Sequence, residues 1–114
     1  MAKFSPDITE IVNRLKQQSL DIVDGVTAAE LALFELFGET EQTLPFFAEL
    51  TTVLEDAEAS YMQLSRLGLN IARSQPNAQP DMLELMNRAI ARTQTRIPAW
   101  ERSLEEVKLE WNLP

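Results

Sequence analysis

The chain has 114 residues, a formal net charge of −8, and neither cysteine nor histidine. This composition excludes disulfides, Ser-His-Asp and Cys-His catalytic groups and histidine-ligated metal centres, and the negative charge disfavours nucleic-acid binding. There is no apolar run near the roughly 18 residues that a membrane span needs and no apolar segment typical of a secretory signal, so we expect one cytoplasmic domain over residues 1–114 with no membrane partner.

The first predicted helix covers residues 6–37. Ser5-Pro6 is typical of a helix start, and Gly38 is typical of a helix end. A capping-box pattern at Thr27-Ala28-Ala29-Glu30, just after Gly25, leaves open a break at that glycine. We favour a continuous helix because the apolar spacing crosses Gly25 unshifted. The residues on the predicted core face are Ile8, Val12, Leu15, Ser19, Ile22, Val26, Ala29, Leu33 and Leu36.

The second predicted helix covers residues 44–73. Thr43 is its expected N-cap, and Pro45 stands in its first turn. The connections on either side, residues 38–42 and 74–79, are short, and short connections place successive helices side by side and antiparallel. The predicted core face carries Phe47, Leu50, Leu54, Ala57, Tyr61, Leu64, Gly68 and Ile71.

The third predicted helix covers residues 80–112 and contains Pro98. The apolar spacing keeps its phase through this proline, which favours one helix with a kink over two helices. Proline releases the carbonyl four residues earlier, that of Gln94, and we expect the Tyr61 hydroxyl or a water molecule to bond it. The predicted core face carries Leu83, Met86, Ile90, Thr93, Ile97, Trp100, Leu104, Val107 and Trp111.

These elements predict an all-α fold: an elongated, antiparallel three-helix bundle with up-down-up topology. The loop positions give an approximate register, which places Trp100 beside the small residues Ala57 and Ala29. The same register gathers five aromatic residues at one end of the bundle, and we expect some of them to be partly exposed. These residues are Phe34, Phe37, Phe46, Phe47 and Trp111.

Two groups of residues are candidates for contact with a partner. Apolar side chains outside the predicted core, together with those at the end where the aromatic residues gather, suggest a protein interface, most simply a twofold homodimer. Arginines spaced four residues apart on the third helix suggest an anionic contact, although surface pairing with acids such as Glu55, Asp56 and Glu58 is the favoured explanation. The candidate interface is Leu20, Leu31, Phe34, Phe37, Phe46 and Trp111, and the candidate anionic contact is Arg88, Arg92 and Arg96.

No pattern in the sequence is typical of an enzyme. The acids fall on predicted outer faces or in loops, and there is no glycine-rich phosphate loop, so we expect no catalytic residues, metal or cofactor. The sequence favours a non-enzymatic helical interaction module, which is a small acidic adaptor, scaffold or regulatory subunit that self-associates. The alternative is a helical bundle that binds a small molecule near Tyr61 and Pro98.

Overall fold

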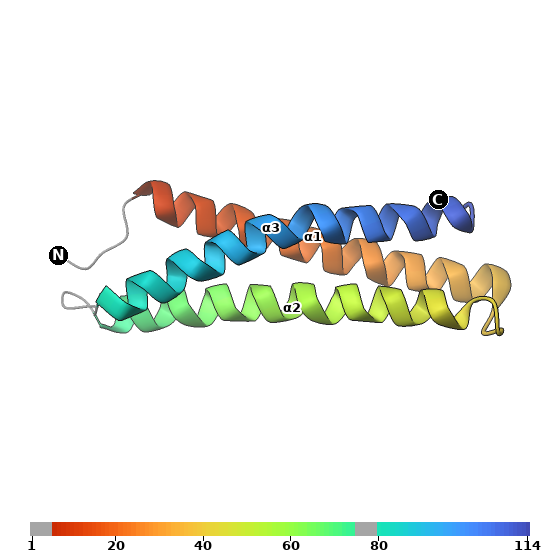
Figure 1. Cartoon of the computed structure of the whole chain (residues 1–114), viewed down its shortest axis with the longest axis horizontal. Helices are drawn as coiled ribbons and strands as arrows, with labels where there is room; N and C mark the ends of the chain where they lie inside the picture. Colours follow the sequence, from red (N-terminus) through yellow and green to blue (C-terminus); the bar gives the residue numbers. More distant parts are fainter. Residues whose placement is uncertain (1–5, 75–79) are drawn as a thin grey trace.

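The computed structural model describes residues 6–74 and 80–114 and folds as three long helices (Figure 1). They are α1 (Pro6–Phe37), α2 (Leu44–Arg73) and α3 (Pro80–Glu110). The molecule measures 55 × 19 × 18 Å, and α2 runs antiparallel to both α1 and α3. The predicted all-α, up-down-up three-helix bundle is confirmed, and the predicted helix bounds differ from the observed ones only at the end of α3.

Helix α1 is continuous through Gly25, as expected. A Cβ atom at this position would lie 2.9 Å from Cδ2 of Leu104, so the missing side chain lets α1 and α3 approach closely at this point. At the end of α1, Gly38 has φ +69° and its N–H donates to the Phe34 carbonyl at 2.8 Å. Only glycine adopts this left-handed conformation at little cost, which is why α1 stops there.

Thr43 is the N-cap residue of α2, as predicted, but the expected capping by its side chain is wrong, because its hydroxyl makes no hydrogen bond to the first turn of the helix. Thr40 and Thr43 instead bond reciprocally: the Thr40 hydroxyl accepts from the Thr43 N–H at 3.1 Å, and the Thr43 hydroxyl accepts from the Thr40 N–H at 2.8 Å. The Thr43 hydroxyl also donates to the Gly38 carbonyl at 2.8 Å. This is a capping box placed three residues earlier, and it fixes the connection between α1 and α2.

Helix α3 runs through Pro98, and Figure 1 shows its axis change direction between its two halves. Pro98 and Gln94 are both exposed, so water can reach the backbone on this side of the helix. Tyr61 is not the partner of the Gln94 carbonyl; its ring lies under Lys16 of α1, with Nζ 5.3 Å from the ring centroid. The proline therefore needs no buried polar partner, which lowers the cost of the bend.

The core runs the whole length of the bundle and draws residues from all three helices. Most of the predicted core positions are buried or half-buried. The prediction is wrong for Leu36, which is 61 % exposed because it lies in the last turn of α1, where the partner helices no longer cover it. The fully buried large side chains of the described residues include Val26, Leu33, Leu50, Leu64, Met86 and Val107.

Candidate functional site

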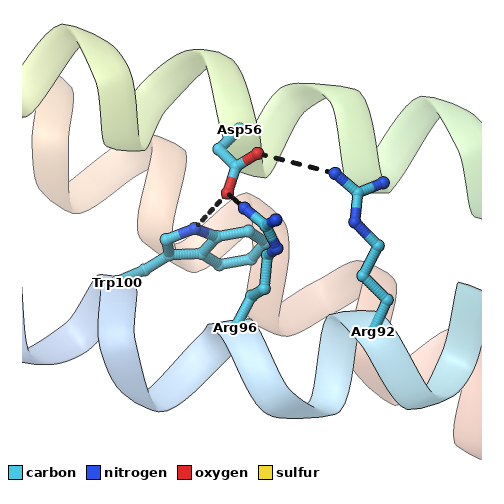
Figure 2. A network of polar contacts seen from close by, with 4 residues as sticks. All are labelled: Asp56, Arg92, Arg96 and Trp100. Atoms are coloured by element: carbon cyan, nitrogen blue, oxygen red, sulfur yellow. Dashed lines mark hydrogen bonds and ion pairs between the residues drawn. The ribbon is translucent and has the colours of Figure 1, made fainter.

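A polar cluster joins α2 to α3 near the middle of the bundle (Figure 2). One carboxylate oxygen of Asp56 accepts hydrogen bonds from Trp100 Nε1 at 2.8 Å and from Arg96 Nη1 at 2.6 Å. The other carboxylate oxygen lies 3.9 Å from Nη2 of Arg92. A single acidic side chain of α2 is thus held by three side chains of α3.

The spacing of the cluster follows from the helix period. Arg92, Arg96 and Trp100 recur every fourth residue, which places them in a row along one side of α3. Asp56 precedes Ala57, which is fully buried, and Trp100 is itself only 4 % exposed. The indole is therefore packed in the core while its N–H reaches the carboxylate at the edge.

Opposing effects set the pKa of Asp56. Burial alone would raise it, but the hydrogen bonds from Trp100 and Arg96 and the positive charges of Arg96 and Arg92 lower it, and the net result is a pKa below the usual 3.8. The carboxylate is therefore ionised at neutral pH and keeps all three partners. The cluster acts as a clamp between α2 and α3.

The three arginines of the candidate anionic contact have different surroundings. Arg92 and Arg96 turn toward Asp56, whereas Arg88 pairs with Glu84 one turn earlier on α3 at 2.7 Å, on an exposed surface. Each arginine therefore has an acidic partner within the chain. The structure brings two of them together and leaves Arg88 apart.

The candidate interface residues gather where α1 ends, α2 begins and α3 ends, with the exception of Leu20, which is exposed on the middle of α1. Trp111 is the centre of this end: its ring lies 4.9 Å from that of Phe37 and 5.4 Å from that of Phe46, measured between centroids. Phe37 and Phe34 are exposed, and Phe46 and Trp111 are half-buried. We call this region the aromatic end.

Comparisons with protein-family models, with curated proteins and with solved structures found no match to this chain. Within residues 6–74 and 80–114, no group of three or more acidic side chains is placed to hold a metal ion. In the same ranges, no helix combines the length and the apolar character needed to cross a membrane.

Sequence reasoning missed several exposed side chains of the aromatic end. Leu36 had been placed in the core, and Leu44 and Leu109 had not been singled out, yet all three are more than half exposed. Their positions in the last or first turn of a helix were the available signal, because neighbouring helices do not cover the outer side of terminal turns. The bond between Asp56 and Trp100 was also missed, although the predicted register had already placed Trp100 beside Ala57.

Proposed function

We propose that this chain is a non-enzymatic helical interaction module that self-associates through its aromatic end. The observation that carries the proposal is a cluster of exposed apolar side chains within a short stretch around the α1–α2 connection. They are between 44 % and 61 % exposed, and exposed clusters of this kind are typical of protein contact surfaces. The members are Leu31, Phe34, Leu36, Phe37 and Leu44.

This surface is already ordered before association, and this favours binding. The rings of Phe37 and Phe46 pack on Trp111, and the hydrogen bonds of Thr40 and Thr43 hold the connection that carries the exposed residues. A contact surface that is ordered before association loses less conformational entropy on binding.

The expected affinity is modest. Burying the exposed half of five leucine and phenylalanine side chains contributes on the order of 5 kcal/mol per copy. Association itself costs about 4–15 kcal/mol. The stretch 31–44 also carries Glu35, Glu39 and Glu41 and no basic residue, so two copies repel each other at this surface. The two copies together gain about 10 kcal/mol, which leaves at most about 6 kcal/mol after the cost of association. We therefore expect a homodimer with a dissociation constant of about tens of micromolar, which tightens as salt screens the carboxylates.

Light scattering coupled to size exclusion tests this proposal. The wild-type chain is expected to dimerise at tens of micromolar, with a larger dimer fraction at higher salt. Phe34→Glu is expected to give a monomer, because a charge would be buried in the contact. Met62→Glu is the matched control, since Met62 is equally exposed but lies on α2 away from the aromatic end.

A wild-type chain that stays monomeric at these concentrations would refute self-association. A dimer that Phe34→Glu and Met62→Glu disturb equally would refute the assignment to the aromatic end. Far-UV circular dichroism of both variants checks that the helices are intact.

A further inference from the structure

A cavity of about 470 Å³ opens between the first half of α1 and the second half of α2. Its walls are mainly apolar, with Val12 from α1 and Leu64 and Leu69 from α2. The space exists because α2 presents Gly68 and Ala72 here, and neither fills the gap between the helices. The volume lies within the range of small-molecule sites, about 300–1,000 Å³.

Ser65 provides an unused hydrogen-bonding group on the wall of this cavity. Its Oγ is buried and has no hydrogen-bond partner. Other hydroxyls on these helices, such as those of Ser19 and Thr52, donate to the carbonyl four residues earlier, at 2.9 Å and 3.0 Å. A buried hydroxyl without a partner is rare in native proteins, which points to a polar group that normally bonds it.

Lys16 provides an unpaired positive charge on the same wall. Its Nζ lies over the Tyr61 ring, 5.3 Å from the centroid, and no carboxylate of the described residues is within ion-pair distance. Arg88, Arg92 and Arg96 each have an acidic partner, and among the described bases without one, Lys16 is the one that lines this cavity. In a chain of net charge −8, a cation held by an aromatic ring beside an apolar cavity is available for an anion.

From these three observations we infer that the α1–α2 cavity binds a small amphiphile with an apolar body and one carboxylate head. The head pairs with Lys16 and accepts the hydroxyl proton of Ser65 in a hydrogen bond, and the body packs on Val12, Leu64 and Leu69. A singly charged head fits because the cavity offers one cation. This site lies near Tyr61, on the α1 side, and is independent of the aromatic end and of self-association.

Decanoate is the probe, and decanol, with the same chain and no charge, is the comparison. In isothermal titration calorimetry, decanoate is expected to bind the wild-type chain with a sub-millimolar dissociation constant. Decanol is expected to bind about fivefold more weakly, because it cannot form the partly exposed ion pair with Lys16. In ¹H–¹⁵N spectra, the amide shifts are expected at the cavity residues and not at the aromatic end.

Three variants locate the site. Lys16→Met keeps the apolar stem and is expected to weaken decanoate about fivefold while leaving decanol unchanged. Ser65→Ala is expected to weaken decanoate to a similar extent, and Ala72→Leu is expected to fill the cavity and block both probes. Lys108→Met, at the other end of the bundle, makes the same change in net charge and is expected to bind decanoate as the wild type does.

The inference is overturned if decanoate does not bind the wild-type chain, or if decanol binds it equally well. It is also overturned if Lys16→Met and Lys108→Met have the same affinity for decanoate, because the charge at Lys16 would then play no part. Thermal unfolding of each variant confirms that it is folded at the temperature of the titration, and the exposed or half-exposed positions of Lys16, Ala72 and Lys108 make these substitutions easy to accommodate.

Discussion

Replacing Asp56 with alanine removes the acceptor of the Trp100 indole N–H, and Trp100 is only 4 % exposed. Leaving a buried donor without a partner costs about 1–3 kcal/mol. The ion pairs with Arg92 and Arg96 add little, about 0.5 kcal/mol each, because those side chains are 48 % and 44 % exposed. We expect Asp56→Ala to lower the free energy of unfolding by about 2–4 kcal/mol.

Urea denaturation, monitored by far-UV circular dichroism, measures this loss. The slope of the unfolding free energy against urea concentration is expected to stay unchanged. Asp56→Asn keeps an acceptor for Trp100 and loses only the charge, so about 1 kcal/mol is expected. Glu84→Ala breaks the exposed pair with Arg88 and is expected to cost about 0.5 kcal/mol or less. In a double-mutant cycle, Asp56→Ala and Trp100→Phe are expected to be coupled by about 1 kcal/mol. Equal losses for Asp56→Ala and Glu84→Ala, or zero coupling, would refute the reasoning.

The pH dependence has a definite sign. The pKa of Asp56 is below 3.8 in the folded chain, and a depressed carboxyl pKa contributes stability that is fully present above the unfolded value. This contribution is lost as pH falls through the folded pKa. The stability difference between the wild type and Asp56→Asn is therefore expected to shrink from about pH 6 to about pH 2. A difference that grew on acidification would contradict the assignment.

Further substitutions test other contacts by the same urea assay. Gly68→Ala is expected to stabilise the chain by about 0.5–1 kcal/mol, because a Cβ there would meet only Met86 Cε, at an ordinary contact distance of 3.9 Å. Gly25→Ala should stabilise less, since its Cβ would displace Leu104. Equal gains for the two variants would contradict this reading. Burial raises the pKa of Glu30 more than its hydrogen bond with Thr51 lowers it, so Glu30→Gln is expected to stabilise by up to about 0.5 kcal/mol at neutral pH. That gain should fade as pH falls through the raised pKa and be absent below the usual value of 4.5, and a gain that persists in acid would have another origin. Trp111→Phe removes a buried N–H that has no partner, so it is expected to lower the free energy of unfolding less than Trp100→Phe, which removes a hydrogen-bonded N–H. The reverse order would refute this.

The fold was predictable because the apolar spacing is strict and residues typical of helix starts and ends stand where the helices begin and end. Pro6 and Gly38 mark the start and the end of α1 as predicted, whereas the predicted cap residue Ser5 lies outside the described residues. The predicted register of α2 and α3 followed from loop position alone. The start of α2 was predicted correctly, but the hydrogen bonds that precede it were not, because Thr40 and Thr43 are both threonines within one turn. Residue type alone does not say which hydroxyl bonds which N–H, and the structure shows that the two threonines bond each other.

The polar sites were less predictable, because they depend on which side of a helix a long side chain takes. Arg88 and Arg92 look alike in the sequence, yet one bonds its own helix and the other turns to α2. The cavity beside Lys16 also left no sequence signal, since it arises where Gly68 and Ala72 of one helix face an unfilled gap to the next.

The up-down-up arrangement has a mechanical consequence. Because α1 starts at one end of the bundle and α3 finishes at the other, a pulling force applied at both termini acts along the 55 Å axis. The helices must then slide past one another, and the load falls on many interhelical contacts at once. The Asp56 clamp and the close fit of Leu104 against Gly25 both oppose that sliding.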